Sequence, residues 1–358
     1  MNQSPGSLYE HKRKLKAILA QRLPMHGARV SCLSMLLLAI VQEKTVNLVS
    51  LSLAFQGNAQ PESCYRRIKR FLREVRLEQK QVAKLIVRLL PAPPYTVCID
   101  RTNWQFGKTD INIMVIGIAH RGVAFPIVWM VLDKAGNSTM DERIDLLKDF
   151  LEVVSAKNIA FLLADREFIG DTWMNYLDKR KIPFAIRVRH NALCDDWLNV
   201  SVLFADVAEG ELKILQHAYR VYGCTVRLVG MKLGHNDYLI IATNHSPSKA
   251  FLAYKIRWSI EMLFSAIKKT GFNLEATHLT ETSKLMTLFS LLALAFSWAH
   301  MVGVWLHESS TKPLKRKAHL RLEKSFFRHG LDYLRSLLKN LPRKNNQLLS
   351  CISFLSCS

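Results

Sequence analysis

The sequence has no two cysteines in a Cys-x-x-Cys arrangement and no signal-peptide pattern. Its seven cysteines therefore predict reduced thiols in a cytosolic protein, and we expect neither a disulfide framework nor a zinc site. Long apolar runs are also scarce, because only residues 285–306 stay uncharged for 22 positions. That run is long enough to span a bilayer, but it contains Thr287, Ser290 and His300. We expect a buried core helix there.

Negative charge is scarce at both ends of the chain. Residues 1–94 hold 16 Lys and Arg against 5 Asp and Glu (+11), and residues 307–358 hold 11 against 3 (+8). The middle of the chain is nearly balanced, with 23 against 21 (+2). Excess positive charge predicts a polyphosphate partner, here double-stranded DNA, because neutralised phosphates release condensed counterions. An anionic membrane could also attract a basic chain, but we expect no membrane partner.

With 358 residues, 49% of them hydrophobic, the chain can fill one large core and a smaller domain. Residues 1–90 have helical patterns, and the last of these carries Arg66, Arg67 and Arg70. A strongly basic helix can lie across a DNA groove, although a plain solvated face explains such a run about as often. The prolines of residues 91–94 prevent helix continuation. We expect a helical DNA-binding domain that ends there.

After residue 94 the pattern changes to that of strands. The strand-like segments are residues 95–100, 111–119, 123–132, 159–165 and 183–189, and helix-like segments at 141–156 and 170–181 separate the last three. A short His-Arg-Gly turn joins the second and third strands, which predicts a hairpin. Three antiparallel strands followed by helix, strand, helix and strand predict an α/β fold with a mixed sheet. This order resembles the ribonuclease-H-like fold.

Two aspartates stand where strands of this plan end. Asp100 lies in "CIDRTNW" and Asp165 in "LLADREF". A single aspartate after a strand is usually a turn or cap residue. Strand ends in a sheet flanked by helices are also where catalytic groups collect, because the sheet fixes the geometry and the loops are free to bind ligand. Two such aspartates therefore favour a site.

The segment "YKIRWSIEMLFSAIK", residues 254–268, predicts a helix with polar residues on one face. At about 100° per residue, Tyr254, Arg257, Glu261 and Lys268 fall within about 60° of one another. We call these four the polar row. Apolar residues form a neighbouring stripe that can bury against a core. An amphipathic helix with ordinary ion pairs explains this segment equally well when it is considered alone.

The two aspartates suggest a role for Glu261 of the polar row. Asp100, Asp165 and Glu261 gathered at one sheet edge would repel one another unless a cation lay between them. An oxygen-rich site of this kind takes Mg²⁺ or Mn²⁺, and two such ions can promote phosphoryl transfer. We therefore expect these three residues to be metal ligands and catalytic groups. The other three members of the polar row would hold substrate phosphates.

At these residues the sequence resembles the DDE transposases of bacterial insertion sequences, specifically insertion-sequence family four. The polar row fits that family's signature Tyr-x2-Arg-x3-Glu-x6-Lys at every gap, and the resemblance spans about residues 45–300. It implies a ribonuclease-H-like catalytic core in two parts, residues 91–190 and 249–306. A β-rich insertion at residues 191–248 would interrupt the core. Residues 307–358 are expected to be a basic helical tail.

The resemblance also implies a function. Such a protein binds the terminal inverted repeats of a DNA element, cleaves the ends and joins them to target DNA by cut-and-paste. It would act as a homodimer in a synaptic complex, at the nucleoid in the bacterial cytoplasm. A non-transposing nuclease of the same fold and a non-catalytic DNA-binding protein remain open alternatives.

An aromatic side chain that stacks a flipped base is implied as well, and the sequence does not identify it. Trp258 beside the polar row and Trp197 in the insertion are the candidates, and we expect Trp258 to bind DNA. Packing is expected of the remaining tryptophans considered, Trp104, Trp129 and Trp173. Arg166 and Glu167 either support the site or form a surface ion pair, which we favour.

Overall fold

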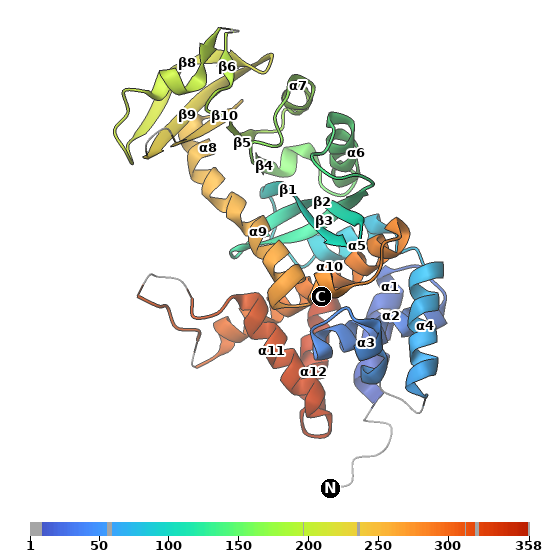
Figure 1. Ribbon diagram of the computed structural model, residues 1–358. Coiled ribbons are helices and arrows are strands. Elements are labelled where there is room, and N and C mark those ends of the chain that lie inside the picture. The colour runs from blue at the N-terminus through green and yellow to red at the C-terminus, as the bar shows by residue number, and fades with distance from the viewer. Residues whose placement is uncertain are drawn as a thin grey trace. The chain divides into compact units, whose positions relative to one another are not determined.

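The computed structural model describes residues 9–55, 59–195, 197–234, 237–311, 313–318 and 322–356 (Figure 1). Of the seven predicted thiols, Cys357 lies outside these residues, and the other six are free and buried. The chain divides into two compact units. The helical unit comprises Met1–Pro91, Trp104–Ile111 and Phe264–Ser358, and the sheet unit comprises Ala92–Asn103 and Asn112–Leu263.

Helices from both ends of the chain build the helical unit. They are α1 (Glu10–Arg22), α2 (Gly27–Glu43), α3 (Leu48–Ala54), α4 (Pro61–Glu74), α5 (Gln79–Val87), α10 (Thr282–Ser309), α11 (Phe326–Lys339) and α12 (Leu341–Ser353). The N-terminal helix α2 packs against both α10 and α11. Residues near the two ends of the chain therefore share one hydrophobic core.

Helix α10 contains the long uncharged run. In the described part of the chain it is the one single helix long and apolar enough to cross a membrane, and 89% of its most apolar window is buried. The helices α2 and α3 pass the same test only as a pair, which bends by 104° at its break. Burial of α10 against its neighbours confirms the prediction of a core helix.

Two glycines allow α10 and α11 to approach closely. A Cβ atom on Gly303 would lie 1.8 Å from the carbonyl oxygen of Phe326, and one on Gly330 would lie 1.9 Å from the carbonyl oxygen of Ala299. Both distances are far below van der Waals contact, so the two backbones touch where only glycine fits.

A mixed sheet organises the other unit. Its strands are β1 (Tyr95–Phe106), β2 (Thr109–His120), β3 (Val123–Leu132), β4 (Ile159–Ala164), β5 (Phe184–Val188), β6 (Leu193–Cys194), β7 (Leu198–Asn199), β8 (Leu212–Val221), β9 (Cys224–Gly234) and β10 (Asp237–Thr243). The described strands lie in the order β3-β2-β1-β4-β5-β10-β9-β8-β6-β7. Helices α6 (Met140–Leu151) and α7 (Asp171–Lys179) connect β3 to β4 and β4 to β5.

The sheet topology confirms the predicted fold class. Strands β2 and β3 pair antiparallel through the predicted hairpin, with Arg121 and Gly122 at positive φ in its turn. Strand β4 pairs parallel with both β1 and β5. This is a ribonuclease-H-like core, and its β-rich insertion follows β5. Because β10 pairs antiparallel with β5, the strands of the insertion extend the core sheet; Figure 1 draws them from yellow-green (β8) to gold (β10).

Strand β1 is longer than the sequence predicts. It was expected to end at Asp100, but it continues to Phe106. Its parallel neighbour β4 ends at Ala164, so Asp100 lies where that neighbour stops. Asp100 is thus in the middle of its own strand, at the level where the neighbouring strand β4 has just ended.

The segment predicted as one helix over residues 254–268 is divided. Helix α8 (Pro247–Tyr254) is followed by a 3-10 turn (Lys255–Arg257), helix α9 (Trp258–Ser265) and a π-helical stretch (Ala266–Thr270). The one-face geometry of the polar row assumed a uniform helix, and that assumption is wrong. Short 3-10 and π stretches change the rotation per residue, and they are frequent at functional positions.

Candidate active site

The register of two parallel strands places the aspartates opposite each other. Cys98 of β1 pairs with Leu163 of β4, an offset of 163 − 98 = 65 residues. Asp100 and Asp165 have the same offset, 165 − 100 = 65, and both lie two residues further along. Side chains two residues apart point to the same face of a sheet, and neighbouring strands are about 4.8 Å apart. The two carboxylates therefore face the same site.

Burial and mutual repulsion both act on Asp100. Its side chain is 16% exposed, and burial raises the pKa of its carboxyl to about 7, with the charge of Asp165 contributing. The backbone N–H of Arg101, which donates to Oδ1 of Asp100 at 2.8 Å, and the charge of Arg257 oppose this rise. Asp100 is a carboxylate that a nearby cation would stabilise.

Arg257 joins Asp100 to the third predicted carboxylate. Its Nη1 donates to Oδ2 of Asp100 at 3.4 Å, and its Nη2 donates to Oε1 of Glu261. Burial would lower the pKa of Arg257, but Tyr254, Glu261 and Asp100 raise it instead. The structure thus brings Asp100, Asp165, Arg257 and Glu261 into one polar cluster, and Arg257 supplies the positive charge between two of the carboxylates.

Tyr254 belongs to the same cluster. Its side chain is buried. Burial raises the pKa of its hydroxyl to about 12; the charge of Arg257 opposes the rise, and that of Asp165 adds to it. The ring of Tyr254 also lies 5.9 Å from the guanidinium of Arg257. Near neutral pH the hydroxyl therefore keeps its proton and can act as a neutral hydrogen-bond donor.

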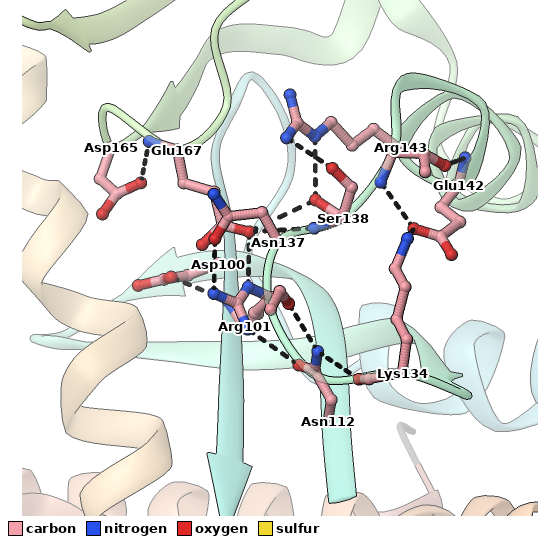
Figure 2. Close-up of polar contacts among 12 residues, drawn as sticks. Asp100, Arg101, Asn112, Lys134, Asn137, Ser138, Glu142, Arg143, Asp165 and Glu167 are labelled. Atoms are coloured by element: carbon pink, nitrogen blue, oxygen red, sulfur yellow. Dashed lines mark hydrogen bonds and ion pairs between the residues drawn. The ribbon is translucent and has the colours of Figure 1, made fainter. Parts of the chain in front are cut away.

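Two residues next to the aspartates hold them in place, as Figure 2 shows. The backbone N–H of Arg101 donates to Asp100, and that of Glu167 donates to Oδ1 of Asp165 at 2.8 Å. The side chains of Arg101 and Glu167 form an ion pair in which each is 14% exposed. One buried ion pair therefore clamps the backbones that carry both carboxylates.

Further hydrogen bonds surround this ion pair (Figure 2). Arg101 also donates to the amide oxygens of Asn112 at 3.2 Å and Asn137 at 3.0 Å. The favoured pairing of Arg166 with Glu167 on the surface is wrong, because Glu167 is turned inward to Arg101. The only sequence signal for this ion pair was that Arg101 directly follows Asp100 and that Glu167 follows Asp165 by two residues. Because the two partners are 66 residues apart in the sequence, no local pattern predicts that they pair.

The remaining predicted phosphate ligand, Lys268, lies in the π-helical stretch and belongs to the helical unit. Its Nζ is 2.7 Å from Oε1 of Glu275 and 5.8 Å from the centroid of the Trp104 ring. Lys268 thus has an anionic and an aromatic partner there. Its predicted contact with DNA remains a prediction.

Trp258 is 58% exposed. It lines a cavity of about 470 Å³ in the sheet unit with Arg121 and Lys255. Trp197 is more exposed, at 74%, whereas Trp104, Trp129 and Trp173 are buried, as expected of packing residues. Exposed aromatic rings next to cationic side chains suit nucleic-acid bases.

The three predicted DNA-binding arginines lie on α4 of the helical unit. All three side chains are on its exposed side. Arg66 pairs with Glu62 at 3.1 Å, with both side chains largely in solvent. Arg67 and Arg70 instead line a cavity. The three arginines are therefore in different environments on one helix.

The donor set of the polar cluster fits a hard divalent cation. Asp100, Asp165 and Glu261 offer carboxylate oxygens, which Mg²⁺ and Mn²⁺ prefer. In the described ranges no three His, Cys, Asp or Glu side chains are grouped as a metal site. Arg257 occupies the position beside Asp100 and Glu261 in which a cation would be stabilised. The carboxylates thus have the donor chemistry that the metal needs but are not gathered around one position, and Arg257 would have to turn away from Asp100 and Glu261 before they could hold an ion.

Comparison with known proteins identifies the family of the chain. A family profile described as "Transposase DDE domain" matches residues 91–298, more than half of the chain, and the match includes all three carboxylates. Comparison with curated proteins gives no significant match. Among solved structures, the chain is similar to a piggyBac transposase in a cryo-EM structure of its synaptic complex with hairpin DNA; the identity is 13%, the TM-score is 0.47, and the match covers 98% of this chain and 83% of the other. The chain belongs to the family of transposase DDE domains.

Proposed function

We propose that this DDE transposase belongs to the insertion-sequence-four type and moves its own element by cut-and-paste. It would bind the terminal inverted repeats, cleave the ends and join them to target DNA. The observation that carries this proposal is the β1–β4 register, which places Asp100 opposite Asp165, together with the link from Asp100 through Arg257 to Glu261. The order of the polar row supports the assignment to this type.

In this proposal Asp100, Asp165 and Glu261 hold Mg²⁺ or Mn²⁺, which when bound supplies an activated oxygen nucleophile and stabilises the leaving oxygen. The Arg101–Glu167 ion pair keeps the two aspartates in register. Arg257 turns from its carboxylates to a DNA phosphate, which its planar guanidinium can hold with two hydrogen bonds. Tyr254 keeps its proton and donates a hydrogen bond from its neutral hydroxyl to a phosphate oxygen.

We further propose that DNA binding begins on the basic flanks. Residues 1–90 form a DNA-binding region in which α4 contacts the backbone, and residues 307–358 assist through backbone contact or subunit pairing. The catalytic core of residues 91–190 and 249–306, with its insertion at 191–248, would act in a homodimer that holds two ends. A protein of this kind works at the nucleoid in the cytoplasm.

Cleavage and joining test this function separately. The substrate is a supercoiled plasmid that carries the gene with its flanking DNA, and the purified full chain is added with Mg²⁺. We expect cuts at the borders of inverted repeats and then joining of the released ends to a second plasmid. Cleavage without joining would indicate a non-transposing nuclease instead. DNA binding with no Mg²⁺-dependent cleavage would contradict the enzymatic function.

A further inference from the structure

A cavity of about 490 Å³ lies beside α2 and α4 in the helical unit. Its lining includes the cationic side chains of Arg29, Arg67 and Arg70, and a single carboxylate, that of Glu74. A cavity of this size is within the range that holds whole small ligands, so it has room for a phosphate with its sugar. Three guanidinium groups around it favour an anionic ligand.

The positive charges in this cavity outnumber the single negative charge of Glu74. In the described part of the chain none of the three arginines forms a salt bridge with a carboxylate. Burial raises the pKa of the Cys32 thiol to about 11, so Cys32 adds no negative charge to the lining near neutral pH. Glu74 is bonded to Arg73 outside the cavity lining, at 2.7 Å. The lining therefore carries a net positive charge.

A histidine side chain complements the arginines. The Nδ1 of His26 accepts from the backbone N–H of Ala28 at 3.3 Å. In the neutral imidazole the proton is then on Nε2, which can donate to an oxygen ligand. His26 is part of the cavity lining. Guanidinium and imidazole N–H groups together match the several oxygens of a phosphodiester.

We infer that this cavity, formed by His26, Arg29, Arg67 and Arg70, binds a backbone phosphate of double-stranded DNA. The inference rests on the proposed function for the presence of DNA. It adds a defined phosphate site that includes Arg29 of α2, and it separates Arg67 and Arg70 from Arg66 on the same helix. The site would fix the position of the duplex on the helical unit, because phosphate contacts set register without reading sequence.

The structure favours DNA over an anionic membrane at this surface. A helix that binds a membrane inserts exposed apolar side chains between the lipid head groups. On α4 the apolar residues Cys64, Ile68, Phe71 and Leu72 are all buried. The exposed side is left with basic and polar groups. Such a surface can follow a phosphate backbone but has nothing to insert into lipid.

The test compares single replacements in the full chain. Arg29→Ala, Arg67→Ala and Arg70→Ala each remove one charge from the cavity, and Arg66→Ala removes the same charge from the same helix outside it. Arg67→Lys keeps the charge and removes the two-pronged geometry. Binding of a fluorescent duplex of mixed sequence is measured by anisotropy over about 50 to 200 mM salt. Circular dichroism and melting temperatures verify that each variant is folded.

We expect each cavity replacement to weaken binding about tenfold, since it removes a charged hydrogen bond. The slope of log K against log salt should become shallower by at most about 0.9, because each variant removes one of the three charges that neutralise this phosphate. Arg66→Ala should weaken binding less than about threefold, and Arg67→Lys should fall between the wild type and Arg67→Ala.

Equal losses of affinity for Arg66→Ala and the cavity variants would refute a defined site and leave only a diffuse basic surface. Binding to vesicles of phosphatidylcholine and phosphatidylserine that depends on the same arginines, with DNA binding unaffected, would assign the surface to lipid and overturn the inference. Failure of the proposed function has a different signature. The wild type would then bind the duplex through the cavity yet cleave no DNA in Mg²⁺.

Discussion

The ion pair between Arg101 and Glu167 gives the sharpest prediction about the site. Each side chain is 14% exposed, and each residue donates its backbone N–H to one of the two aspartates, Asp100 and Asp165. Arg101→Met removes the positive partner and leaves the largely buried Glu167 carboxylate with only the long contacts, 3.4 Å each, from the backbone N–H and hydroxyl of Ser138. Arg101 also supplies hydrogen bonds to Asn112 and Asn137, which the variant cannot make.

The expected magnitude follows from burial. Removing one partner of a buried ion pair costs about 3 to 5 kcal/mol, because the remaining charge is desolvated and unpaired. Since the pair retains some exposure, we expect the free energy of unfolding to fall by about 3 kcal/mol. The double variant Arg101→Met/Glu167→Gln removes the orphaned charge too, so it should recover part of that stability. A coupling energy of about 1 to 3 kcal/mol should result.

Urea denaturation followed by circular dichroism measures these free energies. Arg66→Ala is the matched control, because its ion pair with Glu62 has side chains that are 75% and 67% exposed. That control should cost less than about 1 kcal/mol. A destabilisation by Arg101→Met no larger than that of the control, or no coupling in the double variant, would refute the proposed clamp on the two aspartates.

Three other predictions concern stability. Gly303→Ala and Gly330→Ala should each lower the free energy of unfolding by at least about 2 kcal/mol, because a methyl group would overlap the facing backbone. The control Gly234→Ala has open space around its Cβ and should change the free energy of unfolding little. Equal melting temperatures for the three variants would contradict the close approach of α10 and α11. Trp298→Phe should cost about 0.5 to 1.5 kcal/mol in urea denaturation, since it removes the 2.8 Å hydrogen bond to the carbonyl of Cys351, which still accepts from the backbone N–H of Phe354, and an unchanged midpoint would show that this bond contributes nothing. Burial raises the pKa of the Cys351 thiol to about 12, so the folded state holds this proton more tightly than the unfolded state; this contribution to stability should be complete below about pH 8.5 and decline as pH rises toward 12. Denaturation of wild type and Cys351→Ala over that range checks the last point, and parallel pH profiles would contradict it.

Local patterns were sufficient to predict much of the architecture. Alternating β-branched residues identified the three antiparallel strands, and the turn at Arg121 and Gly122 identified the hairpin. Asp100 and Asp165 were recognised because each follows an apolar run. Their common position could be expected because parallel strands in register bring equivalent residues together, which the Cys98–Leu163 pair bears out.

Features that depend on distant parts of the chain could not be predicted in the same way. Strand β1 continues to Phe106, beyond the point where its neighbour β4 ends at Ala164, so Asp100 is not at the end of its own strand. The inward position of Glu167 requires Arg101, 66 residues earlier. The 3-10 and π stretches around α9 are departures from a uniform helix that hydrophobic periodicity does not record. Each is decided by tertiary contacts and not by local propensity.

Single-turnover cleavage by carboxylate variants tests the central claim most directly. Asp100→Asn, Asp165→Asn and Glu261→Gln each keep the shape of the side chain and remove its charge. In Mg²⁺, with the gene and its flanking DNA as substrate, all three should reduce cleavage by at least about a thousandfold while retaining duplex binding, because the metal would no longer be held. Near-wild-type cleavage by a folded Glu261→Gln protein would contradict the assignment of these three residues to one catalytic site.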